Sequence, residues 1–182
     1  MTRPVALITG ARRGIGRAIG VALAKIGYDI AFTDIAEDEA VVEAATLFEA
    51  NGAKARFFRH DVAAVGSHAG LVADVKAAFG RLDLFVSNAG IGAPVRGDML
   101  EITEESFDLV MDINLRGAAF LSQEVAKAML ADRPSPLTMV RTGRPKSAAR
   151  LPSTSASCAD GSSCAMACAI ARKVACKMLI SS

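Results

Sequence analysis

Residues 9–16 read Thr9-Gly10-Ala11-Arg12-Arg13-Gly14-Ile15-Gly16, and they join a short apolar run, residues 5–9, to a segment with helical periodicity, residues 14–26. Gly10 permits a tight turn, Gly14 lets backbone N–H groups approach a phosphate, and Gly16 allows the helix to pack closely on the strand. The amino end of a helix also offers unpaired N–H groups to an anion. This arrangement predicts a dinucleotide site with the pyrophosphate over the loop.

Short apolar runs alternate with helix-period segments up to about residue 130. The expected strands are residues 5–9, 29–33, 55–60 and 82–87. The expected helices are residues 14–26, 37–49, 67–79 and 103–130. This alternation indicates an α/β fold, a Rossmann-type doubly wound parallel sheet in three α/β/α layers. Ligands bind such sheets beyond the carboxyl ends of the strands, so we expect the site in the loops that follow the strands.

Apolar residues at helical spacing predict the buried faces of the first two helices. These residues are Ile15, Ile19, Ala22, Leu23 and Ile26 in the first helix, and Val41, Val42, Ala45, Leu47 and Phe48 in the second. The helix expected over residues 103–130 begins with a capping pattern, Thr103 followed by Ser106. It is apolar enough to serve as an interface between two copies, so a homodimer is expected.

Asp34 stands at the end of the second expected strand, 18 residues beyond Gly16. A carboxylate there can accept hydrogen bonds from both adenosine ribose hydroxyls and repels a 2′-phosphate, which favours NAD(H). Arg13 points the other way, because its guanidinium could bind the 2′-phosphate of NADP(H). The alternatives are a helix N-cap for Asp34 and a solvated charge for Arg13. NAD(H) is the favoured cofactor, and Arg12 and Ile15 complete the predicted loop contacts.

Two further groups follow the third and fourth expected strands. Asp61-Val62 comes after the third strand, where the carboxylate can accept from the adenine amino group. Asn88-Ala89-Gly90 follows the fourth strand and could line the adenosine ribose. Such residues also occur in ordinary turns, which is the alternative reading. Their position after successive parallel strands favours a place in the site.

The composition argues against several other classes of protein. The sequence is 52% hydrophobic, but it holds no run long enough to span a membrane, and the apolar run near the N-terminus is short for a signal peptide. A cytoplasmic protein that does not bind membranes is therefore expected. Residues 1–132 carry 13 Lys and Arg against 18 Asp and Glu, whereas residues 133–182 carry 8 against 1. That basic tail has no aromatic residue to stack on bases, so no nucleic-acid partner is expected.

All four cysteines lie in the tail. They are Cys158, Cys164, Cys168 and Cys176. Their spacing does not match a zinc site, and the residues before them hold no cysteine, so no metal site is predicted.

Together these motifs resemble the short-chain dehydrogenase/reductases, most closely the 3-oxoacyl-[acyl-carrier-protein] reductase group. The resemblance covers residues 4 to about 131. It rests on the glycine loop, on Asp61-Val62, on Asn88-Ala89-Gly90 and on Asn114 within Asp112-Ile113-Asn114-Leu115-Arg116-Gly117. It implies hydride transfer between a nicotinamide and a ketone or secondary alcohol, with a 3-oxoacyl thioester as one such small-molecule substrate. It also implies pairing of subunits through the helix at 103–130.

The resemblance also implies a catalytic group of serine, tyrosine and lysine assisted by an asparagine, in which the tyrosine acts as the general acid. Asn114 matches the asparagine. The only tyrosine is Tyr28, no Tyr-x-x-x-Lys occurs, and neither Lys173 nor Lys177 follows a tyrosine at that spacing. Three serines, Ser153, Ser155 and Ser157, fall where the family serine is expected. We therefore expect an oxidoreductase by descent that is inactive as written, or alternatively a non-catalytic dinucleotide-binding module.

The sequence changes character after residue 132. Residues 1–132 are expected to form the NAD(P)-binding domain, and residues 133–182 an atypical, poorly ordered or loosely helical tail. Residues 137–140 could be a fifth strand and residues 164–180 a helix. The last two strands of the family do not follow, so the fold is expected to be truncated or diverged at this end. One hypothesis is a shift of the reading frame near residues 134–138; a genuine, diverged or spliced end is the alternative.

Overall fold

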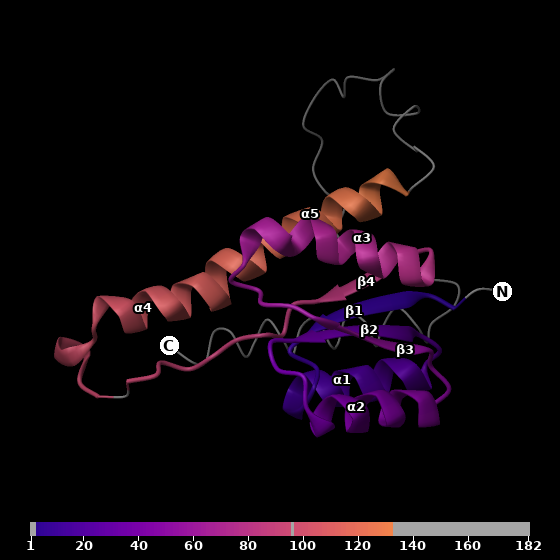
Figure 1. Cartoon of the computed structure of the whole chain (residues 1–182), viewed down its shortest axis with the longest axis horizontal. Coiled ribbons are helices and arrows are strands. Elements are labelled where there is room, and N and C mark those ends of the chain that lie inside the picture. Colours follow the sequence, from indigo (N-terminus) through magenta and orange to yellow (C-terminus); the bar gives the residue numbers. More distant parts are fainter. Residues whose placement is uncertain (1–2, 96, 133–182) are drawn as a thin grey trace, which may run out of the picture. The chain divides into compact units, whose positions relative to one another are not determined.

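The computed structural model describes residues 3–95 and 97–132 (Figure 1). Its strands are β1 (Val5–Thr9), β2 (Asp29–Asp34), β3 (Ala55–Arg59) and β4 (Leu84–Val86). Its α-helices are α1 (Gly14–Lys25), α2 (Glu39–Ala50), α3 (His68–Phe79), α4 (Glu104–Met111) and α5 (Ala118–Ala131). Two short 3₁₀ turns, Val65–Ser67 and Met99–Glu101, and a π-helical turn, η3 (Asp112–Gly117), complete the described elements. The strand and helix expected in the tail, its serines and its cysteines lie outside the described residues.

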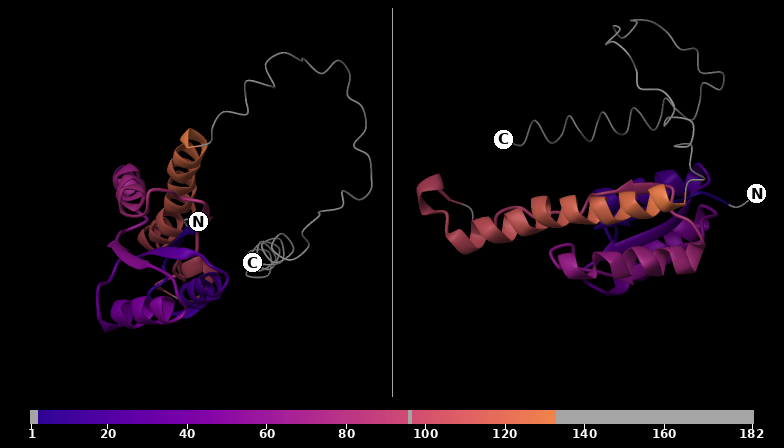
Figure 2. Two further views of the ribbon diagram at one scale, coloured as in Figure 1. Left: turned by 90° about the vertical axis from the view of Figure 1, so that its right-hand side faces the viewer. Right: turned by 90° about the horizontal axis from the view of Figure 1, so that it is seen from above.

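The four strands form one parallel sheet in the order β3-β2-β1-β4. Leu7 of β1 is paired with Ala31 of β2 on one side and with Phe85 of β4 on the other. Helices α1 and α2 cover one face, and α3 and α5 cover the other (Figures 1 and 2). The predicted Rossmann-type architecture is therefore confirmed. The chain leaves β1 towards β3 and then returns to the other side of β1, which puts a crevice between the ends of β1 and β4.

Two hydrophobic clusters hold the layers together. On the α1/α2 face, Phe48 of α2 packs edge-to-face on Phe32 of β2, with ring centroids 5.2 Å apart. Helix α1 reaches this pair through Gly20, where a Cβ atom would lie 2.4 Å from the Phe48 ring. On the opposite face, α3 and α5 pack on Leu7 and Ala31. Both clusters fix the strand ends that form the crevice.

The predicted helix faces are wrong in part. The side chains of Ile15 in α1 and of Ile26, which directly follows α1, are exposed. In α2 the side chains of Val42, at 66%, and Leu47 are exposed as well. The buried residues of α1 are Gly16, Gly20, Leu23 and Ala24, and those of α2 are Val41, Ala44 and Phe48. Small residues on the contact face let the two helices approach each other and the sheet closely. The larger apolar residues beside this contact face consequently remain in contact with solvent.

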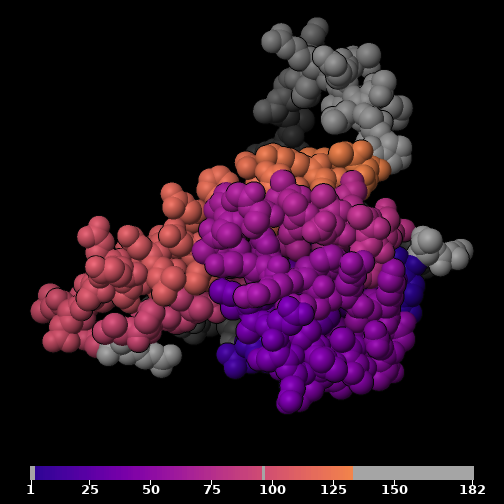
Figure 3. All heavy atoms as spheres, in the orientation of Figure 1, coloured from indigo at the N-terminus to yellow at the C-terminus, as the bar shows by residue number. Residues whose placement is uncertain are grey.

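The helix expected over residues 103–130 is interrupted. Thr103 caps α4 as predicted, because its hydroxyl oxygen accepts a hydrogen bond from the Ser106 N–H at 3.3 Å. The π-helical turn η3 then separates α4 from α5. Only α5 packs on the sheet, through Leu121 and Val125, whereas α4 projects beyond the strand ends (Figures 1 and 3). A π-turn widens the helical backbone locally, and apolar periodicity does not reveal it.

Candidate cofactor-binding site

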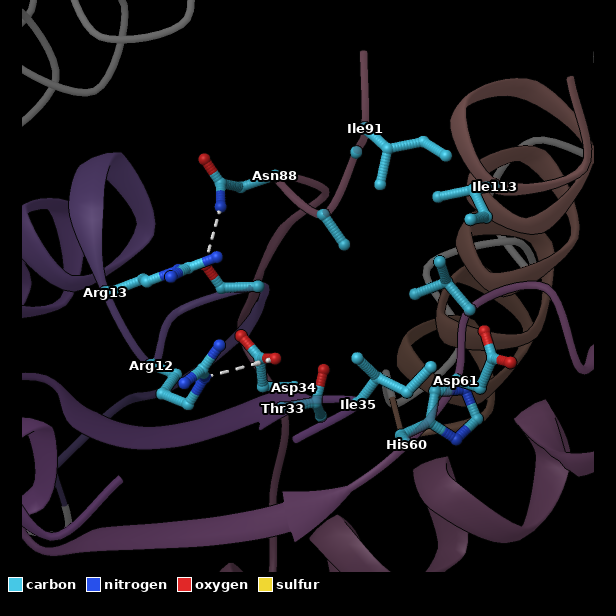
Figure 4. A pocket seen from close by; sticks show the side chains of 14 residues that line it. Arg12, Arg13, Thr33, Asp34, Ile35, His60, Asp61, Asn88, Ile91 and Ile113 are labelled. Carbon is cyan, nitrogen blue, oxygen red and sulfur yellow. Dashed lines mark hydrogen bonds and ion pairs between the residues drawn. The ribbon is translucent and has the colours of Figure 1, made fainter. Parts of the chain in front are cut away.

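A cavity of about 280 Å³ opens at the carboxyl ends of the strands, where the crevice was expected (Figure 4). It brings together nine of the predicted residues, namely Gly10, Arg12, Arg13, Asp34, Asp61, Val62, Asn88, Ala89 and Gly90. The sequence did not single out five others that line it, namely Thr33, Ile35, His60, Ile91 and Ile113. Each of the five is adjacent in sequence to a predicted site residue. The side chains that face this cavity therefore come from four strand exits and from η3.

The glycine loop is closely packed on the exit of β4. Gly10 has a φ of +63°, and a Cβ atom there would lie 2.9 Å from the Cα of Ala89. At Gly16 a Cβ atom would lie 2.4 Å from the Gly10 carbonyl oxygen and 2.6 Å from Asn88 Nδ2. Neither position has room for a larger residue without displacement of backbone atoms.

The first turn of α1 begins directly after this loop. Gly14, Ile15 and Gly16 form that turn, and none of them lines the cavity wall. The N-cap residue Arg13 has an extended backbone, and its side chain makes no capping hydrogen bond. The N–H groups of the turn consequently remain suited to an anion, together with the positive end of the helix dipole.

Thr9 and Asn88 join the exits of β1 and β4. The Thr9 hydroxyl oxygen accepts hydrogen bonds from the backbone N–H groups of Asn88 and Ala89, each at 3.0 Å. In return, Asn88 Nδ2 donates to the carbonyl oxygens of Thr9, at 2.9 Å, and of Gly10, at 3.0 Å. Figure 4 draws the second of these bonds. Because Thr9 is buried, these bonds are shielded from water and fix the two walls of the crevice relative to each other.

Arg12, rather than Arg13, lies beside Asp34. The Arg12 Nε atom is 3.4 Å from Asp34 Oδ1 (Figure 4), and Arg12 Nη1 pairs with Asp38. Asp38 is also the N-cap of α2, accepting from the Ala40 N–H at 3.1 Å, so the N-cap alternative for Asp34 is wrong. Arg13 is exposed and forms no ion pair with any described residue.

Asp61 and Val62 belong both to a turn and to the cavity wall. Asp61 Oδ1 accepts from the Ala63 N–H at 2.9 Å, and the Val62 carbonyl oxygen accepts from His68 Nε2 at 3.0 Å. The local hydrogen bonds predicted by the turn interpretation are thus present. They leave the Asp61 side chain at the cavity, where its second carboxylate oxygen can face a ligand.

A pair of buried histidines adjoins this part of the site, and one of them, His60, lines the cavity. The rings of His60 and His68 have centroids 5.3 Å apart, and within the described part of the chain neither His60 Nε2 nor His68 Nδ1 has a hydrogen-bond partner. Burial lowers the pKa of His60 below its ordinary value of 6.5, and His68 lowers it further, while Asp61 acts in the opposite direction. Protonation of His60 is therefore less favourable in the folded protein than in the unfolded chain.

This shift predicts a loss of stability under mildly acidic conditions. As the pH falls through the ordinary pKa of 6.5, the unfolded chain binds more protons at His60 than the folded protein does. The free energy of unfolding is therefore expected to fall as the pH drops from about 7.5 to about 5.5. Urea unfolding at a series of pH values measures this change, and His60→Leu should show a shallower dependence. An equally steep dependence in His60→Leu would rule out His60 as its source.

Asn114 lies in η3 and uses its whole side-chain amide to hold the exit of β4. Its Nδ2 donates to the Ile91 carbonyl oxygen at 2.8 Å, and its Oδ1 accepts from the Ile91 N–H at 2.9 Å. A role for Asn114 in a proton relay stays a prediction. Tyr28 precedes β2 and lies at the opposite end of the strand from the cavity residues Thr33 and Asp34.

A family model described as short chain dehydrogenase matches residues 4–140, more than half of the chain. The chain belongs to the short-chain dehydrogenase family. It is 37% identical over 126 residues to a 2-dehydro-3-deoxy-D-gluconate 5-dehydrogenase from Dickeya dadantii, covering 69% of this chain and 48% of that protein. A galactitol 2-dehydrogenase from Agrobacterium fabrum is 38% identical over 133 residues, covering 72% and 49%. The chain thus spans about half the length of these curated relatives.

Solved structures of this family agree with the fold. A 3-oxoacyl-[acyl-carrier protein] reductase from Brucella melitensis in complex with NAD is 50% identical, with a TM-score of 0.68, covering 75% of this chain and 53% of that one. A short chain dehydrogenase from Mycobacterium paratuberculosis bound to NAD is 35% identical, with a TM-score of 0.65, covering 70% and 51%. The resemblance to the 3-oxoacyl reductase group is therefore confirmed over the N-terminal part of the chain.

The described residues hold neither a membrane-spanning helix nor a metal-binding cluster. None of their helices has the length and apolar character needed to cross a membrane. Among the same residues, no three His, Cys, Asp or Glu side chains are grouped so that they could hold a metal ion.

Proposed function

We propose that this chain binds NAD(H) in the cavity between β1 and β4, with the pyrophosphate on the first turn of α1. The observation that carries the proposal is the cavity itself, in which the glycine loop and the exits of four parallel strands meet. Three buried polar atoms of residues that line the cavity, Arg12 Nε, Thr33 Oγ1 and His60 Nε2, have no hydrogen-bond partner among the described residues. Such atoms fit a site that receives a polar ligand or ordered water.

We assign each of these residues to the part of the dinucleotide that its position in the site would contact. Gly14, Ile15 and Gly16 supply backbone N–H groups for the pyrophosphate, and Asp34 is placed for the ribose hydroxyls. Asp61 and the backbone of Val62 are placed for the adenine. When bound, the nicotinamide supplies hydride to a ketone or takes it from a secondary alcohol. A 3-oxoacyl thioester is the substrate class we favour, because the Brucella melitensis relative is a 3-oxoacyl reductase.

We propose that these 182 residues bind the dinucleotide but do not transfer hydride to or from a substrate. Its sequence contains no Tyr-x-x-x-Lys, and Tyr28 lies far from the cavity. The general acid of the family reaction is therefore missing from these residues. The alternative is an active oxidoreductase whose proton donor is another group.

A fluorescence titration combined with a turnover assay tests both parts of this proposal. NADH is added to the purified chain, and its emission is followed before and after a ketone or a 3-oxoacyl thioester is supplied. We expect saturable enhancement of NADH fluorescence and no consumption of NADH. No enhancement at any concentration would contradict binding, and rapid consumption would contradict the proposed loss of catalysis.

We further propose that two copies pair through exposed apolar residues of α4, η3 and α5. The large apolar residues exposed there are Phe107, Leu109, Leu115, Phe120 and Leu130. Large apolar side chains exposed outside the core are typical of a subunit interface. Sedimentation velocity should show a dimer, and a monodisperse monomer at micromolar concentration would contradict this pairing.

A further inference from the structure

Arg12 is held between two carboxylates that come from different elements. It belongs to the glycine loop, whereas Asp34 ends β2 and Asp38 precedes α2. The Arg12 side chain is only 11% exposed, compared with 13% for Asp34 and 49% for Asp38. Its Nε atom faces Asp34 at 3.4 Å, and Nη1 pairs with Asp38. Arg12 Nη1 donates a hydrogen bond to Asp38, whereas the buried Nε atom lies at ion-pair distance from Asp34 and has no hydrogen-bond partner among the described residues. The hydrogen bond and the ion pair together hold the guanidinium in one orientation.

We propose that Asp38 makes this cavity selective for a dinucleotide with a free 2′-hydroxyl by holding Arg12 in this cluster. This proposal rests on the proposed NAD(H) binding. It assigns the preference for NAD(H) over NADP(H) to a residue outside the cavity lining. Asp38 does not line the cavity and acts through Arg12, so it is a positioning residue.

Charge and geometry both oppose a 2′-phosphate in this arrangement. One guanidinium and two carboxylates leave the cluster with a net negative charge, and a phosphate dianion there would meet two like charges. The phosphate would also have to displace Asp38 to reach Arg12 Nη1. A ribose hydroxyl needs only an acceptor, which Asp34 offers without any rearrangement.

Removal of the charge on Asp38 should reverse this preference in part. With Asp38 neutral, the cluster loses its excess negative charge, and Arg12 Nη1 becomes free to donate to a phosphate. The proposal therefore differs from one based on Arg13, which is exposed and lies in the cavity wall. If Arg13 determined the preference between NADH and NADPH, loss of an Arg12 ion pair would leave that preference unchanged.

Asp38→Asn is the variant that separates this role from helix capping. Asparagine keeps an oxygen that can accept from the Ala40 N–H, so the N-cap of α2 is retained while the charge is lost. Glu39→Gln is the matched control, because Glu39 is exposed, adjacent in sequence, and forms no ion pair with any described residue. A third variant, Asp38→Asn combined with Arg12→Gln, tests whether the effect passes through Arg12.

The experiment measures dissociation constants for NADH and NADPH with the full chain by fluorescence titration. In Asp38→Asn we expect the affinity for NADPH relative to NADH to rise about tenfold, and the gain to shrink as salt is added. Glu39→Gln should leave the ratio unchanged, and the double variant should lose the gain. Thermal unfolding of each variant checks that the fold is retained.

Three results would overturn the inference. The ratio could stay unchanged in Asp38→Asn while NADH still binds, it could shift equally in Glu39→Gln, or the gain could survive without Arg12. Failure of the wild-type chain to bind either dinucleotide would instead contradict the proposed function, and that result is distinct from the other three.

Discussion

Gly16→Ala is expected to abolish NADH binding and to lower the free energy of unfolding by about 2 kcal/mol. The added Cβ would lie 2.4 Å from the Gly10 carbonyl oxygen and 2.6 Å from Asn88 Nδ2. It would also lie 2.8 Å from the Cα of Ala11. Gly10 and Ala11 belong to the loop, and Asn88 holds the loop to β4. Relief of the overlap must therefore move the loop or α1, and either movement displaces the N–H groups proposed for the pyrophosphate.

Gly70→Ala is the matched control for this substitution. Gly70 lies within α3, and a Cβ atom there would meet nothing within 4 Å. Alanine in a helix interior is favoured over glycine by up to about 1 kcal/mol, so this variant should be as stable as the wild type or more stable. NADH titration and urea unfolding report the two effects separately. If the Gly16→Ala variant bound NADH with wild-type affinity, that result would contradict the assignment of the glycine loop as the pyrophosphate site.

Thr9→Val is expected to cost about 2–4 kcal/mol of folding free energy, although the two side chains have nearly the same shape. Valine removes the hydroxyl oxygen that accepts from the N–H groups of Asn88 and Ala89. Thr9 is buried, so water cannot readily replace that acceptor. NADH affinity should fall as well, because both of those residues line the cavity.

Thr9→Ser keeps the hydroxyl and tests whether the bonds or the packing matter. It removes one methyl group, so it should cost about 1 kcal/mol and retain NADH binding. Chemical denaturation of the wild type and both variants provides the comparison. The proposed role of the hydroxyl fails if Thr9→Ser loses as much stability as Thr9→Val.

The general fold could be predicted from the sequence because local patterns determine it. The glycine loop lies between a strand and a helix, and parallel strands bring their carboxyl ends to one edge of the sheet. That rule alone places Asp34, Asp61 and Asn88 around one cavity. The predicted helix faces were partly wrong because Gly16 and Gly20 lie on the buried face of α1. A prediction from apolar periodicity gives such small residues little weight.

Two features of the site could not be predicted because they depend on tertiary contacts. Arg12 and Asp38 are separated by 26 residues, and the ion pair forms only when α2 starts beside the glycine loop. Asn114 is bound to the backbone of Ile91, 23 residues earlier, through a π-helical turn. No local pattern distinguishes Arg12 from its neighbour Arg13. The three-dimensional arrangement shows that one is paired and that the other is exposed.

The position of the dinucleotide can be tested directly by NMR of the ¹⁵N-labelled chain. Titration with NAD should change most strongly the backbone amide signals of Gly14, Ile15 and Gly16, with further changes at Val62 and Ala89. Signals from the far end of α2, near Ala50, should stay in place. If saturating NAD left the three loop amides unchanged, the claim that the loop receives the pyrophosphate would be wrong.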